Sequence, residues 1–486
     1  LDYNQTYAST LPGCCFRLWI SCVADEDLET DSIDAVKAFT QSDIDRELYV
    51  AMPLGFAIPG YCLLLKKALE GIKQGSYLWF QKNKWAWNKC GCFASEHEPN
   101  LYTHQSLRIL AAVFADDVGA AFPAAQREDY LKVRAEYGKL INIDSPGPET
   151  IVPVTKFTGV NVSRDRAAGT ISISMESYIG KLEDRHKGEY TLNEMPTGKS
   201  KAARDAFEKM EPGTAETMGD RKLFLELLGE DAWPAYMCFP ECVHTVSHLG
   251  RFMLYPMDVH IAAAYHLMGY YVRHKFDKIT YGGKLKIPLG VDSAPPYFEE
   301  SRGVYAASDS SWNTRVKPQG GHVVMRMNAA ILWSSKAMKI VIADSTCHAE
   351  TAEMSKCSKS VMFVRMTSAG IGRPVMGPTL LLGDNRATDI LVTKEGASSR
   401  SRHFELATIF VKYMVLRLVV KCQLVRTHFM IADIFTKATD ESTFFRMKHE
   451  LRNSSAEEVA RDTQGAYARR VKDALARIAK GLGVCE

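Results

Sequence analysis

Two adjacent aspartates, Asp116 and Asp117, lie in an otherwise apolar stretch, RILAAVFADDVGAAF, that runs from Arg108 to Phe122. The apolar residues on both sides predict two buried strands that form a hairpin around the acid pair. Neighbouring carboxylates repel each other and are costly to remove from water unless a cation compensates their charge. Oxygen ligands suit a hard divalent cation, and such cations commonly serve phosphate chemistry. The pair is therefore a candidate metal site, and the alternative is a solvent-exposed acidic turn.

A third acid, Asp34, precedes this pair by about eighty residues. The apolar residues around it predict a strand that ends near Asp34, followed by a turn or short helix. Phe39 follows at a distance that allows it to line the same pocket as the acids. The acids immediately upstream are expected to form a solvated loop; they are Asp25, Glu26, Asp27, Glu29 and Asp31.

Between these acids, Gly71 and Gly75 bracket Lys73 and Gln74. Glycine permits close approach of the backbone, and a lysine there can contact a phosphate or a template strand. The alternative is an ordinary glycine turn beside an amphipathic helix.

A second set of acids occupies the last third of the chain, and each acid lies where a predicted apolar element begins or ends. Four acids placed in this way can converge on two metal ions, whereas each one alone would pass as a helix cap or turn residue. The four are Asp309 in YAASDSSWN, Glu350 in STCHAETAEM, Asp384 in TLLLGDNRA and Asp433 in HFMIADIFTK.

The composition is that of a globular protein, with 46% hydrophobic and 24% charged residues among 486. A formal net charge of +3 does not by itself indicate a nucleic-acid partner. No stretch reaches the roughly 18 apolar residues of a membrane span, so no membrane partner is expected. The cysteines without a secretory leader favour a reducing compartment, and the first residue, Leu1, suggests a piece of a longer chain.

Four potential zinc ligands are spaced C-x3-C-x-H-x3-H. On one helix Cys242, His244 and His248 do not share a face, because positions two apart point apart. A packing helix is therefore preferred to structural zinc at Cys238, Cys242, His244 and His248.

The order of these motifs resembles the reverse transcriptase of copia-type LTR retrotransposons. The family words DVKTAFLNGDL, LYGLKQAP, YVDD and FLGI correspond to residues from Asp34, 69–76, 114–117 and 157–160. The last third is similar to the RNase H domain of the same family, since residues 331–350 resemble its WSSK segment and residues 432–437 read ADIFTK. Residues 223–271 are similar to the helical region between the two.

The resemblance implies an α+β right-hand polymerase of palm and fingers, a helical thumb or connection, and an α/β RNase H-like domain. The expected boundaries are 1–195 for N-terminally truncated fingers and palm, 196–219 for a linker, 220–285 for the thumb or connection, 303–445 for RNase H and 446–486 for a helical tail.

The resemblance also implies roles for the acids. Asp34 and Asp116, with Asp117 as third acid, would hold two Mg²⁺ or Mn²⁺ ions for DNA synthesis. Asp309, Glu350, Asp384 and Asp433 would hold two more for RNA cleavage. Glu353 is a substitute for Glu350, because the chain has an extra residue near Cys347, and His403 is a candidate auxiliary residue. The implied nucleotide-binding set is Ala38, Phe39, whose ring would exclude a 2′-hydroxyl, Glu70, Gly71, Lys73 and Gln74.

The implied partners are an RNA template, a DNA primer, an RNA–DNA hybrid and deoxynucleoside triphosphates, in a cytoplasmic virus-like particle or the nucleus, before DNA integration. Two departures predict weakened polymerase function. Glu70 stands where the family has Tyr, and a carboxylate repels a triphosphate. We also expect the family's Lys/Arg-rich fingers segment, which would precede residue 1, to be missing. The alternatives are therefore a relic that only binds nucleic acid, and a nuclease with RNase H activity alone.

Overall fold

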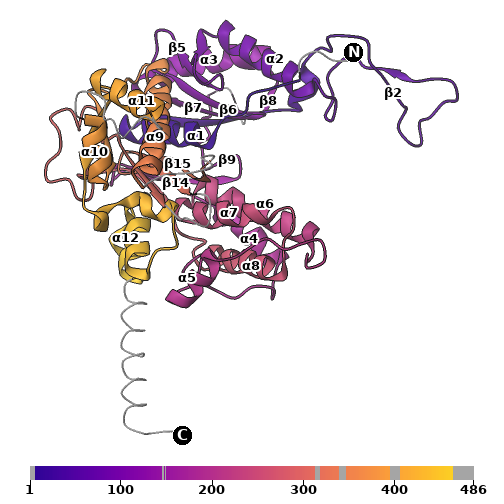
Figure 1. Ribbon diagram of the computed structural model, residues 1–486. Coiled ribbons are helices and arrows are strands. Elements are labelled where there is room, and N and C mark those ends of the chain that lie inside the picture. Colours follow the sequence, from indigo (N-terminus) through magenta and orange to yellow (C-terminus); the bar gives the residue numbers. More distant parts are fainter. Residues whose placement is uncertain are drawn as a thin grey trace, which may run out of the picture. The chain divides into compact units, whose positions relative to one another are not determined.

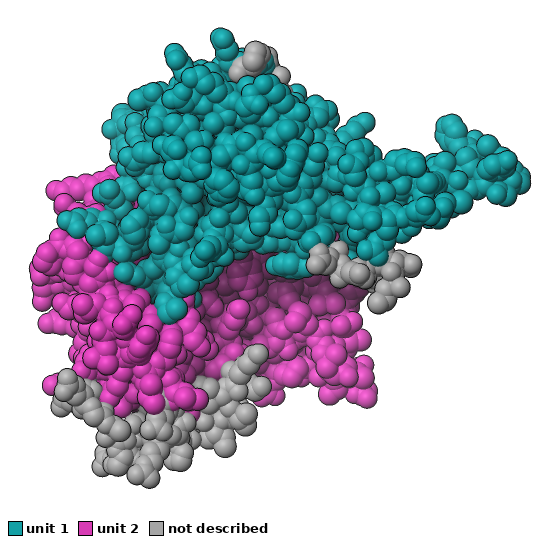
Figure 2. All heavy atoms as spheres, turned by 90° about the horizontal axis from the view of Figure 1, so that it is seen from above, with its two compact units in different colours: residues 1–171, 300–302, 360–376 teal, residues 172–299, 303–359, 377–486 magenta. Residues whose placement is uncertain are grey.

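The computed structural model describes residues 6–144, 147, 149–311, 318–338, 346–393 and 405–462 (Figure 1). It forms two compact units, and each is described by itself. Unit 1 comprises residues 1–171, 300–302 and 360–376, and unit 2 comprises residues 172–299, 303–359 and 377–486 (Figure 2). His403 and residues 463–486 of the predicted tail lie outside the described residues.

Unit 1 is built on a six-stranded sheet with the strand order β4-β5-β6-β7-β1-β8. All neighbouring strands are antiparallel. The predicted hairpin around the acid pair is confirmed as β6 and β7, and the predicted strand at Asp34 is confirmed as β1. The strands are β1 (Glu29–Ala35), β4 (Cys92–Ala94), β5 (Leu101–His104), β6 (Leu110–Phe114), β7 (Asp117–Phe122) and β8 (Ile143–Asp144).

Helices cover both faces of this sheet because its strands are apolar on both sides. Helices α2 (Gly75–Lys89) and α3 (Arg127–Leu140) bury their aromatic residues on one face, and α1 (Gly13–Asp25) lies on the other (Figure 1). Gly119 lets α1 approach closely, since a Cβ there would lie 3.1 Å from the ring of Trp19. The Trp19 indole N–H also donates to the carbonyl of Leu110 at 3.3 Å. Strands β9 (Lys156–Phe157) and β10 (Val160–Asp165) also belong to unit 1, and they pair with each other in antiparallel orientation.

The expectation of a solvated acidic loop is wrong for Asp31. This residue is fully buried in β1, where it accepts hydrogen bonds from the Tyr130 hydroxyl at 2.6 Å and the Val152 amide at 2.8 Å. The guanidinium of Arg134 lies 3.3 Å away. These partners lie about a hundred residues further along the chain. They compensate the charge of Asp31, which its acidic neighbours in the sequence had suggested would be exposed. Asp25 and Glu26 are also paired in unit 1, with Arg302 and with Arg108 and Arg373 respectively.

An apolar arm extends from unit 1 between β1 and α2 (Figure 2). It contains the two-stranded sheet of β2 (Tyr49–Val50) and β3 (Leu63–Leu64). Leu54 is 99% exposed and Phe56 and Tyr61 are each 73% exposed. A hairpin of this size contributes little stability alone, and the arm leaves an unusual amount of apolar surface in water.

The first part of unit 2 is helical, as expected for 220–285. The segment 196–219, for which a linker was predicted, contains α5, which Ser200 caps by accepting from the Ala203 amide. Two strands, β11 (Thr170–Ser174) and β12 (Ile279–Gly282), flank the helices. The helices are α4 (Glu176–Arg185), α5 (Lys201–Glu208), α6 (Arg221–Met237), α7 (Val243–Leu249) and α8 (Asp258–Arg273).

The rest of unit 2 contains a mixed five-stranded sheet with the order β15-β14-β13-β16-β17. The central strand β13 is antiparallel to β14 and parallel to β16. This sheet and the helices near it in the sequence combine α and β elements. The elements of residues 303–462 are β13 (Tyr305–Ser311), β14 (Gln319–Arg326), β15 (Ala329–Ala337), α9 (Thr346–Gly370), β16 (Thr379–Gly383), α10 (Arg386–Thr393), α11 (Glu405–Leu416), β17 (Val420–Leu424), the 3₁₀ turn η7 (Ile431–Phe435) and α12 (Glu441–Arg452). The last part of α9, residues 360–370, belongs to unit 1. Among the helices of the described ranges, none is long and apolar enough to cross a membrane.

Candidate active sites

The strand register of unit 1 brings the three predicted acids of the first site together. Asp34 on β1 lies directly opposite Asp117 on β7. Asp116 occupies the tight turn before β7, and its carbonyl accepts from the Ala35 amide at 3.2 Å. Asp144 on β8 pairs with Asp34 from the other side. This fourth carboxylate was missed because nothing in the sequence indicates that β8 adds to that edge.

Burial and neighbouring negative charges raise the pKa of two acids of this site, Asp34 and Asp117. Burial raises the pKa of Asp34, and the charges of Asp116 and Asp144 raise it further. Burial also raises the pKa of Asp117, although the Thr158 amide, which donates to its Oδ2 at 3.1 Å, opposes that shift. Carboxylates whose ionised forms are disfavoured by burial and by neighbouring negative charge are oxygen ligands that a divalent cation would stabilise.

The predicted nucleotide-binding residues fall into two groups. Phe39 lies beside the start of α2, since a Cβ on Gly75 would lie 3.8 Å from its ring. Phe39 also lines a cavity of about 90 Å³ together with Trp79 and Ala115. Ala38 and Gln74 are buried next to these elements, whereas Glu70, Gly71 and Lys73 are exposed in the segment before α2.

Trp79 supports the turn that carries Asp116 through a hydrogen bond that was not predicted from the sequence. Its indole N–H donates to the carbonyl of Ala115 at 2.8 Å, and Ala115 has a left-handed φ of 52°. This hydrogen bond holds the residue immediately before Asp116 in a conformation that few non-glycine residues adopt.

We expect Trp79→Phe to destabilise unit 1 by about 1–3 kcal/mol, because a part-buried carbonyl loses its donor. Trp87→Phe is the matched control. Trp87 is also buried in α2, but its indole N–H has no hydrogen-bond partner among the described residues. Urea unfolding of both variants checks the prediction. An equal loss of stability in both variants would contradict it.

The second site lies in unit 2, where three of its four predicted acids converge. Ligand oxygens of Asp309, Glu350 and Asp384 lie within 4.8 Å of one another. Asp309 comes from the central strand β13, Glu350 from the first turns of α9 and Asp384 from the residue after β16. The Ser310 amide donates to Glu350 at 3.3 Å and helps to orient it.

Asp433 joins this site through the turn η7, which packs against β14. A Cβ on Gly321 would lie 2.4 Å from Phe435, so only glycine permits this close approach. The Thr436 hydroxyl then donates to Asp309 Oδ2 at 2.5 Å, and Lys437 Nζ lies 2.9 Å from Asp433 Oδ2. Asp433 Oδ1 is buried without a hydrogen-bond partner among the described residues. Such an unpartnered carboxylate oxygen fits the donor set of a divalent cation.

The electrostatics of the second site resemble those of the first. Burial and the charges of Asp309 and Asp384 raise the pKa of Glu350 to about 9. Burial and Asp309 raise the pKa of Asp433 to about 7, against the opposing effect of Lys437. Both pKa shifts are expected for buried carboxylates that lie close together without enough positive charge nearby.

Glu353 is not a substitute for Glu350. Its carboxylate lies 2.7 Å from His322 Nδ1 and 2.9 Å from Lys356 Nζ. Burial would raise the pKa of Glu353, but these two partners hold it below its usual value. Glu353 is therefore an ion-paired residue, and Glu350 is the acid that meets Asp309 and Asp384.

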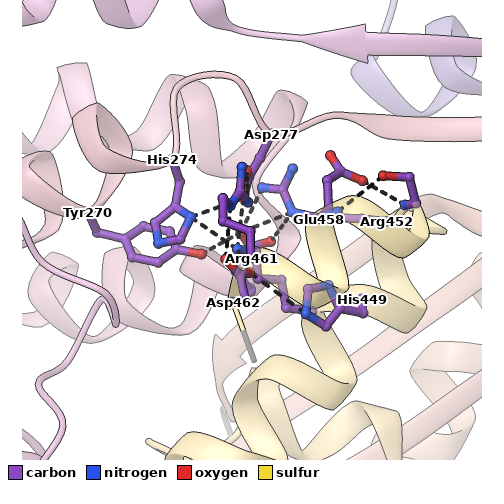
Figure 3. Close-up of polar contacts among 11 residues, drawn as sticks. Tyr270, His274, Asp277, His449, Arg452, Glu458, Arg461 and Asp462 are labelled. Atoms are coloured by element: carbon purple, nitrogen blue, oxygen red, sulfur yellow. Dashed lines mark hydrogen bonds and ion pairs between the residues drawn. The ribbon is translucent and has the colours of Figure 1, made fainter. Parts of the chain in front are cut away.

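A third group, His274, Asp277 and Asp462, also has ligand atoms within 4.8 Å of one another (Figure 3). The ammonium of Lys448 lies among them, 2.7 Å from Asp277 Oδ2, 2.8 Å from Asp462 Oδ2 and 3.1 Å from His274 Nδ1. Lys448 is 1% exposed. The chain's own cation therefore fills this cluster, which joins α8 and its following turn to the segment after α12.

We expect Lys448→Met to lower the free energy of unfolding by about 3–5 kcal/mol, because it removes the buried ammonium from Asp277 and Asp462 and leaves them mainly a half-exposed cation. Burial would raise the pKa of Asp277, but Lys448 and His274 hold it well below its usual range. Asp277 therefore adds stability that is present at neutral pH and lost in acid, and the variant should show a weaker acid dependence. Chemical unfolding at several pH values measures both effects. Arg461→Ala, which removes a half-exposed partner of the same acids, should cost no more than about 1 kcal/mol; a larger loss in this control than in Lys448→Met would refute the account.

The potential zinc ligands lie around α7, as the packing-helix interpretation predicted. Cys238, Cys242 and His248 are buried. His244 Nε2 lies 2.8 Å from Glu208 Oε1, so this histidine already has a carboxylate partner at the end of α5.

Comparison with known proteins identifies the region that carries the first site. A family model described as reverse transcriptase (RNA-dependent DNA polymerase) matches residues 1–194. A putative transposon Ty5-1 protein of Saccharomyces cerevisiae is 28% identical over 324 residues, which are 65% of this chain and 96% of that protein. The retrovirus-related Pol polyprotein from transposon TNT 1-94 of Nicotiana tabacum is 22% identical over 453 residues, covering 91% of this chain and 32% of the polyprotein.

The chain thus spans about a third of the length of that polyprotein. Among solved structures, a foamy viral protease-reverse transcriptase in complex with an RNA/DNA hybrid is similar with a TM-score of 0.40 and 10% identity, covering 82% of this chain and 44% of that one. The family match and the transposon relatives agree with the motifs around Asp34, Asp116 and Asp117. Residues 1–194 match the reverse transcriptase family, and the chain is similar over most of its length to retrotransposon Pol sequences, in agreement with the copia-type resemblance of its motifs.

Proposed function

We propose that the chain is an RNA-directed DNA polymerase with a separate ribonuclease H site. The observation that carries the first activity is the strand register, which sets Asp34 opposite Asp117 with Asp116 in the adjoining turn, inside the region that matches the reverse transcriptase family. The partners would be an RNA template, a DNA primer and deoxynucleoside triphosphates.

At the first site, Asp34 and Asp116 would hold two Mg²⁺ or Mn²⁺ ions, and Asp117 would support them. When bound, these ions would activate the primer 3′-hydroxyl and neutralise charge on the triphosphate. The Thr158 amide orients Asp117, and Trp79 fixes the turn that presents Asp116. The ring of Phe39, beside Gly75, would contact the sugar and exclude a 2′-hydroxyl.

At the second site, Asp309, Glu350, Asp384 and Asp433 would hold two ions that activate water for cleavage of RNA in an RNA–DNA hybrid. The support for this activity is the convergence of three carboxylates within 4.8 Å and the buried, unpartnered Oδ1 of Asp433. The Ser310 amide and the Thr436 hydroxyl orient Glu350 and Asp309 respectively.

The test is to assay the full chain for extension of oligo(dT) on poly(rA) and for cleavage of a labelled RNA–DNA hybrid, each with Mg²⁺ and with Mn²⁺. Both activities are expected. Cleavage without extension would support a nuclease only, consistent with the exposed carboxylate at Glu70. Neither activity, with retained binding of the hybrid, would support a relic that only binds nucleic acid.

A further inference from the structure

Two consecutive residues after η7 each engage a different acid of the second site. The Thr436 hydroxyl donates to Asp309, and the Lys437 ammonium lies 2.9 Å from Asp433. The backbone fixes both over Asp433, because the amides of Thr436 and Lys437 donate to its carbonyl at 3.1 and 3.2 Å. This turn therefore delivers a hydroxyl and a cation into the carboxylate cluster.

Lys437 differs from the other lysine that pairs with an acid near this site. Lys356 pairs with Glu353, whose second oxygen is engaged by His322. Asp433 keeps a buried oxygen without a partner beside the one that Lys437 contacts. The ammonium of Lys437 also interacts electrostatically with Asp309 and Asp384, so its charge acts on three acids of the site.

The Lys437 side chain is 47% exposed, and its flexible stem reaches the site from solvent. It can therefore leave Asp433 without moving the backbone, unlike the buried Lys448. A bound divalent ion and this ammonium would compete for the same carboxylate charge.

We propose that Lys437 is a built-in placeholder cation, which neutralises Asp433 in the metal-free protein and must withdraw when a divalent ion binds. Lys437 is thus a positioning residue that sets the metal affinity of the second site. This inference rests on the proposed metal-dependent function of that site.

The experiment measures the melting temperature of the full chain against Mg²⁺ concentration, in an Asp116→Asn background that weakens the first site. In that background Lys437→Ala should melt lower without Mg²⁺ and reach half of its Mg²⁺-induced shift at a roughly tenfold lower concentration, because no ammonium has to be displaced. Lys437→Arg, which keeps the charge, should restore the concentration seen with Lys437. Lys356→Ala is the matched control, since its side chain is 43% exposed and pairs with a buried acid, and it should leave the half-saturating concentration unchanged.

The outcomes separate the two ideas. If the background protein shows a Mg²⁺-induced shift and Lys437→Ala has the same half-saturating concentration, the placeholder role is wrong and the metal site stands. If Lys356→Ala lowers that concentration as much, the effect is general charge removal and the placeholder role is again wrong. If Mg²⁺ does not raise the melting temperature of the background protein, and Glu350→Gln does not change that melting temperature, the proposed metal site fails, and this inference fails with it.

Discussion

Replacement of Asp116 by asparagine is expected to reduce deoxynucleotide incorporation about 10³-fold, which corresponds to a loss of roughly 4 kcal/mol of transition-state stabilisation. The substitution keeps the size of the side chain and removes the negative charge that the site offers to a cation. Asp116 is exposed in the turn, so the amide costs little to the fold. Primer extension at saturating nucleotide measures the loss.

The cleavage of an RNA–DNA hybrid by the same variant is the internal control. Asp116 lies in unit 1, and the second acid cluster is built entirely from residues of unit 2. Cleavage should therefore stay within about twofold of the original chain, which is a change of well under 1 kcal/mol. Loss of both activities with an unchanged melting temperature would sink the assignment of two separate sites.

Replacement of Glu350 by glutamine should have the opposite selectivity. Hybrid cleavage is expected to fall by about 10³-fold, since Glu350 lies between Asp309 and Asp384 and supplies the charge that would hold an ion there. Incorporation of deoxynucleotides should persist. A gel assay of hybrid cleavage and a primer-extension assay on the same preparation give the comparison.

The same variant should be more stable than the original chain when no metal is present. The pKa of Glu350 is raised to about 9 in the folded protein, so its ionisation opposes folding as pH rises from its usual value towards 9. Glutamine removes that penalty. With EDTA, the two proteins should therefore melt alike near pH 5, and the variant should melt higher at pH 8. A variant that melts lower at pH 8 would show that Glu350 contributes structure rather than electrostatic strain.

Local pattern was sufficient to predict the elements that carry the acids. The apolar flanks of Asp116 predicted a hairpin, and the apolar residues before Asp384 predicted a strand, because strand formation there depends on neighbours in the sequence. Asp34 was also placed correctly at the end of a strand, with a short helix after it.

Residues whose roles depend on distant partners could not be predicted in this way. Asp31 looked like part of a solvated acidic run, yet Tyr130, Arg134 and Val152 bury and pair it. Asp144 reaches the first site through a strand pairing that has no local signature. Thr436 and Lys437 stood in the recognised ADIFTK word, but only the fold shows which carboxylates they touch. The sequence therefore indicated which side chains could bind a metal ion, but it did not indicate which distant residues compensate their charges.

The pairing of β1 with its two neighbours has a consequence for insertions and deletions. Side chains alternate between the faces of a strand, so loss of one residue between Glu29 and Asp34 would turn Asp34 away from Asp117 or shift every upstream contact, including that of Asp31. A copy of this coding sequence that lost a single codon there would still encode the seven candidate metal-binding acids of the two sites, and it would still align with its relatives. Its first site would nevertheless be dismantled. Intact motifs are therefore a weaker sign of a working copy than intact motifs at unchanged spacing within β1.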